Sequence, residues 1–309
     1  MVHLSFGEGV LTTRAELDAK IREILADNQE RLGVQCTHDS ISGQFAQLIK
    51  LAHKKYGERV VVLVDEYDKP ILDNIQDNAA AIAMREGLRN VYSVIKSAGA
   101  HIRFAFLTGV SKFSKVSLFS GVNNLRDITL SEQYSAICGY TDADVDSTFA
   151  PELAGLDRGM IRRWYNGYNW SGEAVYNPFD LLLLFQERKF GAWWYASGTP
   201  SFLLKLLEQR TFFAPLLAQM QVGPELISNL DVDQMTPEAL LFQAGYLTIH
   251  QLGHTLSGEC QYTLGYPNKE VELSLNMSLL GTYTGDLSQC HQHRNKLEAL
   301  LPMVTLPQL

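Results

Sequence analysis

The first half of the chain alternates short apolar runs with longer segments in which apolar positions recur at helical spacing. Residues 60–64 form a continuous, mainly β-branched run, residues 102–108 form a second apolar run, and residues 2–6 largely alternate apolar and polar positions. Such runs predict strands, and the continuous run at 60–64 is typical of a strand buried on both faces of a parallel sheet. We expect one further strand near residues 127–134.

Helices are expected between these runs because the intervening segments carry both the periodicity and the caps. Thr13 and Glu16 have the spacing of a capping box, in which the hydroxyl and the carboxylate each bind a free backbone N–H. Gly57 ends a second expected helix, and a third covers residues 84–99. Strands that alternate with helices predict an α/β fold with a parallel sheet and right-handed crossovers.

The pattern changes from about residue 147, where helices and aromatic loops replace the alternation. Asn177 and Pro178 predict the N-cap and the first residue of a helix. Further helices are expected at residues 201–209 and 237–244, and beyond Gly265 the periodicity is too weak to assign an element. We therefore divide the chain into an α/β core over residues 1–146, a mainly helical region with aromatic loops over residues 147–265, and an unassigned linker over residues 266–309.

Composition narrows the function classes. The chain has 309 residues, of which 46% are hydrophobic and 19% are charged, so a folded globular protein is expected. The net charge of -8 argues against sequence-independent binding of nucleic acid, which needs phosphate-neutralising cations. No apolar run approaches the roughly 20 residues of a membrane span, and no signal peptide is visible, so a cytoplasmic location is expected. The four separated cysteines are expected to be buried free thiols.

The sharpest chemical feature is the acidic pair Asp65 and Glu66, which directly follows the run at residues 60–64. In P-loop ATPases a buried strand ends in an aspartate that holds Mg²⁺, usually through water. An adjacent glutamate can orient and deprotonate the water that attacks the γ-phosphate. The alternative is a buried strand followed by a solvated acidic turn, and the pattern alone does not separate the two interpretations.

The next strand ends in hydroxyl residues. Thr108 closes the run at residues 102–108, and Ser111 follows three positions later. A hydroxyl at this place can contact both water and phosphate, so both residues are candidates for sensing the γ-phosphate. The alternative is that Thr108 and Gly109 only turn the chain.

The sequence does not contain the other half of such a site. A P-loop needs a glycine-rich turn and a Gly-Lys-Ser/Thr at the start of a helix, where amides and the lysine hold the phosphates. No Gly-Lys-Ser/Thr occurs anywhere in the 309 residues.

Three segments carry a resemblance to a known family. They are VVVLVDEYDKPILD at residues 60–73, FAFLTGVSKFSKVSLFSGVNNLRDITL at residues 104–130 and WYNGYNWSGEAVYNPFDLL at residues 164–182. Together they resemble the bacterial AAA-ATPase-like family, whose full members are similar to a P-loop ATPase with a helical lid and a nuclease-like domain of the PD-(D/E)XK type. The resemblance covers most of residues 2–270.

The resemblance implies roles for the residues already singled out. It makes Asp65 and Glu66 the Walker B pair, with Asp65 toward the metal and Glu66 catalytic, and it puts Thr108 and Ser111 at the first sensor. It implies ATP and Mg²⁺ as cofactors and a P-loop NTPase-like core that lacks its P-loop strand and helix. The Walker A segment would precede Met1, and the nuclease-like domain would follow about Tyr266. A truncated family member, inactive as an ATPase in this form, is the expectation.

For other candidate residues, a functional role and a purely structural role are both possible. His250 and His254 could share a helix face for a metal, although Gly253 lies between them and a loop is favoured. Arg126, Arg162 and Arg163 could reach phosphates or be surface charges.

The aromatic residues of the third segment leave two options. They could stack on a base, but packing of a lid is favoured. The cluster consists of Trp164, Tyr165, Tyr168 and Trp170.

Three functions from different classes are compatible with these residues. The first is an ATP-binding protein whose nucleotide state regulates a protein partner or an attached nuclease. The second is a non-catalytic interaction module or gene remnant that binds no nucleotide. The third, a metal-dependent nuclease, needs a carboxylate pair with Glu-x-Lys and ranks last, because no such signature stands out. A protein partner or a homo-oligomer is expected, and neither a membrane nor a nucleic acid is.

Overall fold

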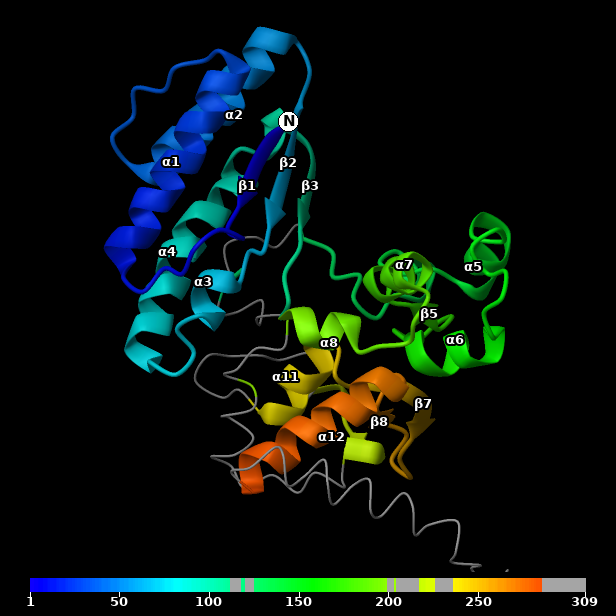
Figure 1. Ribbon diagram of the computed structural model, residues 1–309. Helices are drawn as coiled ribbons and strands as arrows, with labels where there is room; N and C mark the ends of the chain where they lie inside the picture. The colour runs from blue at the N-terminus through cyan, green and yellow to red at the C-terminus, as the bar shows by residue number, and fades with distance from the viewer. Residues whose placement is uncertain (112–117, 120–124, 199–202, 204–216, 226–235, 285–309) are drawn as a thin grey trace, which may run out of the picture. The chain divides into compact units, whose positions relative to one another are not determined.

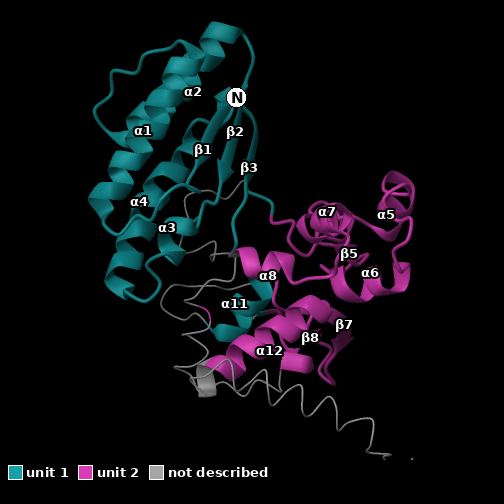
Figure 2. Ribbon diagram, viewed as in Figure 1, with its two compact units in different colours: residues 1–126, 225–244 teal, residues 127–224, 245–309 magenta. Residues whose placement is uncertain are grey.

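The computed structural model describes residues 1–111, 118–119, 125–198, 203, 217–225 and 236–284. The chain divides into two compact units (Figure 2). Unit 1 consists of residues 1–126 and 225–244, and unit 2 consists of residues 127–224 and 245–309. The three-part division expected from the sequence stays a prediction.

Unit 1 is built on a parallel sheet of three strands, β1 (Val2–Ser5), β2 (Val60–Asp65) and β3 (Ile102–Leu107). The spatial order is β1-β2-β3. The three strands expected in this part of the chain and their parallel arrangement are confirmed. The α/β class follows from them.

The helices of unit 1 begin and end where the sequence signals lie. The Thr13 hydroxyl accepts from the Glu16 N–H, the Glu16 carboxylate binds the Thr13 N–H, and the predicted capping box is confirmed. Gly57 caps the second helix in the left-handed region at φ 71°. The helical elements are α1 (Arg14–Leu32), α2 (Ile41–Tyr56), α3 (Lys69–Leu72), α4 (Asn78–Ser97), the 3₁₀ turn η1 (Gly99–His101) and α11 (Pro237–Gln243).

The long helices α1, α2 and α4 lie on one face of the sheet (Figure 1). The chain moves across the sheet in one direction, from β1 to β2 to β3, and right-handed crossovers in one direction put every connecting helix on the same side. The side chains that point toward these helices, such as Val62 and Val64, are buried.

The opposite face of this sheet is apolar and largely open. Val61 and Leu63 are half-buried there, whereas Phe104 is 55% exposed and Phe106 is 36% exposed. The two phenyl rings stack on one another with centroids 6.2 Å apart. The expectation that residues 60–64 are buried on both faces is therefore wrong for the face that carries Val61 and Leu63.

Unit 2 contains both helices and antiparallel strands. Its strands form a β4-β5 pair and a three-stranded sheet in the order β6-β8-β7, so the region expected to be mainly helical also holds sheet structure. The predicted helix that opens with Asn177 and Pro178 is confirmed, with the Asn177 side chain accepting from the Phe179 N–H. The elements are η2 (Glu132–Tyr134), α5 (Asp142–Thr148), α6 (Arg158–Tyr165), β4 (Asn166–Tyr168), β5 (Val175–Tyr176), α7 (Pro178–Glu187), α8 (Trp193–Gly198), β6 (Met220–Val222), β7 (Thr248–His254), β8 (Cys260–Gly265) and α12 (Lys269–Thr284).

One expected strand and one expected helix in this half of the chain have different outcomes. The strand expected near residues 127–134 is wrong: Asp127 accepts from the Thr129 N–H at 3.0 Å, and the segment ends in η2. A short polar side chain that binds its own backbone competes with a strand ladder in this way. The helix expected at residues 201–209 lies outside the described residues except for Leu203.

The aromatic cluster packs in the core of unit 2. Tyr165 is fully buried, Tyr168 is nearly so, and the Tyr165 ring stacks on Phe190 with centroids 6.1 Å apart. Burial of both phenol rings favours packing over base stacking for this segment. The core around them contains Val145, Ile161, Tyr165, Tyr176, Leu181 and Leu184.

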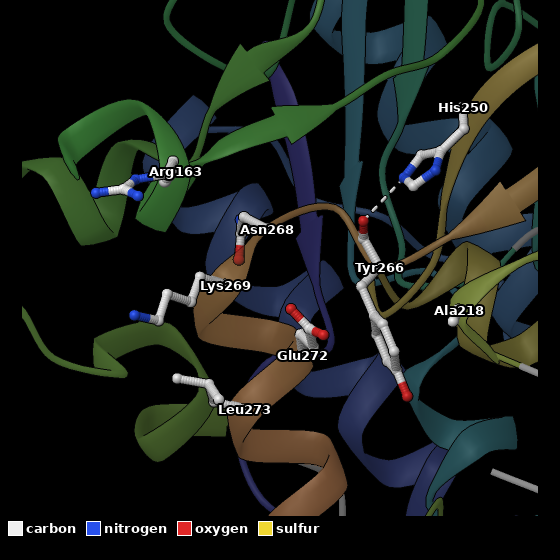
Figure 3. A pocket seen from close by; sticks show the side chains of 8 residues that line it. All are labelled: Arg163, Ala218, His250, Tyr266, Asn268, Lys269, Glu272 and Leu273. Carbon is white, nitrogen blue, oxygen red and sulfur yellow. Dashed lines mark hydrogen bonds between the residues drawn. The ribbon is translucent and has the colours of Figure 1, made fainter. Parts of the chain in front are cut away.

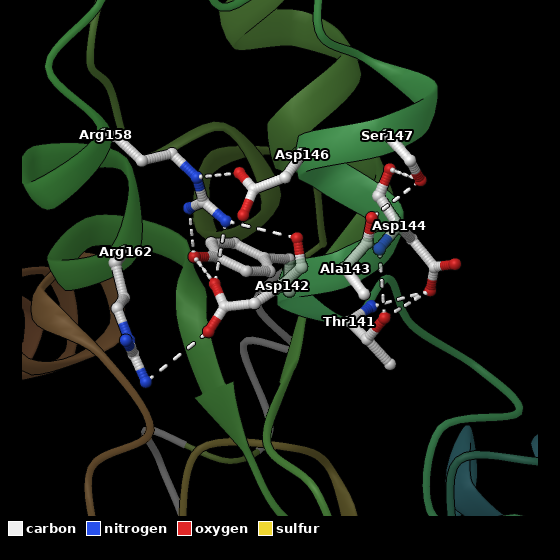
Figure 4. Close-up of polar contacts among 9 residues, drawn as sticks. Thr141, Asp142, Ala143, Asp144, Asp146, Ser147, Arg158 and Arg162 are labelled. Atoms are coloured by element: carbon white, nitrogen blue, oxygen red, sulfur yellow. Dashed lines mark hydrogen bonds and ion pairs between the residues drawn. The ribbon is translucent and has the colours of Figure 1, made fainter.

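An ion-pair network joins α5, α6 and β5 (Figure 4). Arg158 lies 2.7 Å from the carboxylates of both Asp142 and Asp146, and the Tyr176 hydroxyl donates to Asp142 at 2.7 Å. Arg162 approaches the second oxygen of Asp142 at 3.4 Å. Partial burial opposes ionisation of Asp142, but the bonds from Tyr176 and Arg158 prevail and hold its pKa below the ordinary value of 3.8.

The structure also bears on two smaller expectations. Within the described ranges, no helix is both long enough and apolar enough to cross a bilayer. Cys36, Cys138 and Cys260 are free thiols, but Cys138 and Cys260 are exposed, so the expected burial is wrong for these two. Cys290 lies outside the described residues.

The open face of the sheet can be tested by substitution. We expect Phe104→Thr combined with Phe106→Thr to change the free energy of unfolding of unit 1 by less than about 1 kcal/mol, because the rings are exposed and threonine suits a strand. Aggregation, followed by light scattering, should decrease. The control Phe45→Ala removes a fully buried ring from α2 and should cost about 3–5 kcal/mol. A loss of similar size in the double variant would show that the two rings are part of the core.

Candidate functional site

The carboxyl-terminal edge of the parallel sheet brings two of the predicted site residues together. Val64 on β2 is paired with Leu107 on β3, so the next residues, Asp65 and Thr108, leave the sheet side by side. The Thr108 hydroxyl donates to Asp65 Oδ1 at 2.7 Å. The parallel pairing therefore brings the two side chains together, while the roles of the two residues stay predictions.

Glu66 directly follows this contact and has an uncommon backbone conformation. Its φ is 52°, in the left-handed region that side chains other than glycine rarely adopt. Such a backbone costs about 1–3 kcal/mol and often occurs at functional sites. The half-buried Glu66 carboxylate faces the loop after β1, where a methyl group on Gly7 would lie 3.4 Å from Oε1.

Ser111 lies close to these residues in sequence, but its hydroxyl is engaged elsewhere. The Ser111 hydroxyl and its N–H both donate to Asp68 Oδ2 at 2.5 Å, and the Val110 N–H donates to Asp68 Oδ1 at 3.2 Å. Both Ser111 and Asp68 are buried. The structure thus pairs Ser111 with Asp68 rather than with Asp65 or Glu66, and its sensor role stays a prediction.

Asp68 is a residue that sequence reasoning missed. In the sequence it belongs only to the acidic turn that follows residues 60–64. In the structure its carboxylate links the loop after β2 to the loop after β3. A side chain at Gly109 would collide with it, which explains glycine at that position. Burial raises the pKa of Asp68 above its ordinary value, although the bonds from Ser111 and Val110 oppose the rise. Its partners Val110 and Ser111 lie 42 and 43 positions away in the sequence, so no local pattern indicated the contact.

Tyrosines reinforce the same connection. The Tyr67 hydroxyl donates to the Ser111 carbonyl at 2.6 Å, and the Tyr92 hydroxyl on α4 donates to the Tyr67 carbonyl at 2.9 Å. The Tyr67 N–H also donates to the Thr108 carbonyl at 2.9 Å. The loops that carry Asp65, Glu66 and Thr108 are therefore fixed to each other and to α4.

The donor set at this edge fits a hard cation that keeps most of its water. Asp65 is exposed, and carboxylate and hydroxyl oxygens are the ligands that Mg²⁺ prefers. Within the part of the chain that the structure describes, no group of three His, Cys, Asp or Glu side chains could enclose a metal. The geometry suits one or two protein carboxylates with water and a phosphate, not a closed protein cage.

Unit 2 has a separate cavity of about 460 Å³ (Figure 3). His250 Nε2 lies 2.9 Å from the Tyr266 carbonyl beside it, and Lys269 Nζ lies 5.1 Å from the centroid of the Trp164 ring. The lining residues are Arg163, Ala218, His250, Tyr266, Asn268, Lys269, Glu272 and Leu273.

The histidines and arginines named from the sequence have different surroundings. His250 and His254 lie on strand β7, so neither a helix nor a loop describes them. Arg162 is part of the ion-pair network with Asp142, Arg163 lines the cavity of unit 2, and Arg126 is exposed.

Comparisons with known proteins agree with part of this description. Residues 1–119 match the model of a family described as predicted AAA-ATPase, the AAA-ATPase-like family, which supports the resemblance found in the sequence. The chain is 54% identical over 301 residues to an uncharacterised protein encoded in the 5′ region of vnfD in Azotobacter chroococcum mcd 1. That alignment covers 97% of this chain and 58% of the relative, so the chain spans little more than half of the relative's length. No solved structure matches the chain.

A pair of substitutions separates the structural aspartate from the candidate ligand. Asp68→Ala leaves two buried donors of Ser111 and the part-buried N–H of Val110 without this acceptor, and we expect it to lower the free energy of unfolding by about 1–3 kcal/mol. Asp65→Ala removes an exposed side chain and should change it by about 0.5 kcal/mol or less. Chemical denaturation measures both. Equal losses in the two variants would contradict the distinction.

Proposed function

We propose that residues 1–119, which match the predicted AAA-ATPase model, form the Mg²⁺-binding half of an ATP site of the P-loop type. The observation that carries the proposal is the contact between Asp65 and Thr108 at the carboxyl-terminal edge of adjacent parallel strands, with Glu66 next in the chain. Open α/β sheets bind ligands at this edge, and P-loop ATPases hold Mg²⁺ with an aspartate placed there.

Each residue then has a defined task. Asp65 binds a water of the metal, and the Thr108 hydroxyl fixes the orientation of the Asp65 carboxylate. Glu66 orients the attacking water and accepts its proton. Asp68 and Ser111 act as positioning residues, because they hold the loop after β3 against the loop after β2. When bound, Mg²⁺ neutralises charge on the phosphate oxygens.

In this proposal, the backbone amides and the lysine that hold the phosphates belong to a segment beyond these 309 residues. Among the described residues β3 pairs only with β2, so its other edge is open, and the sheet face beside it carries Phe104 and Phe106. A strand paired to β3 and connected back to β1 by a right-handed crossover would put its helix on that face. Such a unit would carry the glycine-rich turn at the same edge as Asp65, in a longer form of the protein.

Control of a protein partner, or of further copies of the chain, is the proposed biological role of the site. The proposed location is the cytoplasm. A non-catalytic interaction module is the second candidate, and the open apolar sheet face favours it. The two differ in whether the carboxyl-terminal edge of the sheet binds a divalent cation.

Cation binding at Asp65 is the direct test. We expect Mn²⁺, a paramagnetic substitute for Mg²⁺, to broaden the NMR signals of Asp65, Glu66 and Thr108 at millimolar concentrations. Asp65→Asn should abolish the broadening, because it removes the carboxylate that contacts Thr108. The control Asp27→Asn removes an exposed carboxylate from α1 and should leave it unchanged. Broadening that survives Asp65→Asn, or none at all, would favour the interaction module.

Turnover is a separate prediction. We expect the chain as given to hydrolyse ATP far more slowly than about 1 s⁻¹, the low end for kinases, because positioning and charge stabilisation of the phosphates supply most of the catalysis. A radiolabelled phosphate-release assay measures this. Turnover near that rate, lost in Glu66→Gln, would show that this chain holds the phosphates by itself.

A further inference from the structure

Two acidic side chains are completely buried in unit 2. Asp180 lies in the first turn of α7, and Glu270 lies in the first turn of α12. They are 90 positions apart and belong to two sequence motifs, Asn-Pro-Phe-Asp and Pro-Asn-Lys-Glu, whose purpose the candidate ATP site does not explain. Fully buried carboxyl groups are rare unless they are paired.

A third helix supplies one hydrogen bond to each acid. At the start of α8, the Trp194 N–H donates to Asp180 Oδ1 at 2.8 Å and the Tyr195 N–H donates to Glu270 Oε1 at 3.0 Å. These amides belong to the first turn of α8, where backbone N–H groups have no partner within the helix. The two acids therefore cap α8 from α7 and α12.

Among the described residues, the second oxygen of each acid lacks a hydrogen-bond donor. Asp180 Oδ2 and Glu270 Oε2 are buried and accept no hydrogen bond from any other described group. Besides burial, a side-chain hydrogen bond between the two acids raises the pKa of Glu270 and opposes the rise in the pKa of Asp180. Two carboxylates cannot satisfy each other, because both only accept, whereas a carboxyl and a carboxylate can.

Among the residues that the structure describes, no charged side chain compensates two ionised acids. The titratable groups that face the pair are the phenols of Tyr165 from α6 and Tyr168 from β4, both neutral at pH 7, since burial raises the pKa of each. Within the described ranges, no Lys, Arg or His forms an ion pair with Asp180 or Glu270. Like charges so close and so deeply buried disfavour double ionisation.

We propose that Asp180 and Glu270 share a single proton, and that this proton fastens the start of α12 to α7 and α8. The pair then carries one negative charge, which the amino-terminal ends of the three helices stabilise. The same helix ends disfavour a cation between the two acids. This inference is independent of the ATP site, which lies in unit 1.

The shared proton makes the stability of unit 2 depend on pH. Burial, then the bond and charge of Asp180, raise the pKa of Glu270 from 4.5 to about 9. The unfolded chain releases the proton near pH 4.5, whereas the folded chain keeps it to about pH 9. The folded state therefore binds more protons across this window, and stability decreases as pH rises through it.

Replacement of Glu270 by glutamine tests the proposal in the full chain. The amide of Glu270→Gln can donate to Asp180 at every pH and can still accept from the Tyr195 N–H. We expect its melting temperature at pH 8 to exceed that of the wild type, and its decrease between pH 5.5 and pH 8 to be smaller. Asp180→Asn, the mirror substitution, should also flatten the pH dependence. The control Glu272→Gln removes an exposed carboxylate from the same helix and should leave it unchanged.

A measurement on the wild type keeps the proposal testable if a variant does not fold. With ¹³C only in the glutamate carboxyl groups, one signal should remain in the protonated position above pH 7. The absence of such a signal overturns the proposal. A Glu270→Gln variant with a lower melting temperature than the wild type at pH 8 also overturns it. So does stabilisation by Mn²⁺ that is seen in the wild type and not in the Glu270→Gln variant.

Discussion

The parallel pairing of β2 with β3 is the constraint on which the candidate site depends. Because both strands run the same way, their last residues meet at one edge, and the register sets which two side chains touch. Asp65 and Thr108 are the first residues beyond the ladder, and the contact between them follows from that register. The buried carboxylate of Asp68 then holds the two following loops at a fixed separation. Rigid loops at a sheet edge are what a site needs to orient a metal and a water.

The same topology explains why the sheet has an open face. Successive right-handed crossovers in one direction can cover only one side, and an α/β sheet normally buries both. Phe104 and Phe106 are then not a local defect but the consequence of a strand order that runs one way among the described residues. A crossover in the opposite direction is the simplest element that covers them. Under the proposal of an ATP site, it would also deliver a helix start to the edge where Asp65 and Glu66 lie.

Caps and apolar runs predicted the elements of unit 1 well, because these elements are determined by residues that are close in the sequence. Thr13 and Glu16 begin α1, Gly57 ends α2, and the apolar runs of β2 and β3 lead to Asp65 and Thr108. The signals failed where a distant partner or a local side-chain bond decides the structure. The bond from Thr129 to Asp127 replaced an expected strand, and three of the antiparallel strands of unit 2, β4, β5 and β6, are only two or three residues long. Asp68 could not be identified either, because its partners lie on another strand's loop.

The cost of burying a carboxyl group is offset differently in the two units, because the acids receive different numbers of hydrogen bonds. Asp68 receives three hydrogen bonds, two from backbone amides and one from the Ser111 hydroxyl, so protein dipoles replace its water. Asp180 and Glu270 receive one backbone bond each, which leaves one oxygen of each without a donor. A proton between them supplies the missing donor and removes one of the two charges. The cost is a stability of unit 2 that changes with pH, because the attachment of α12 depends on that proton.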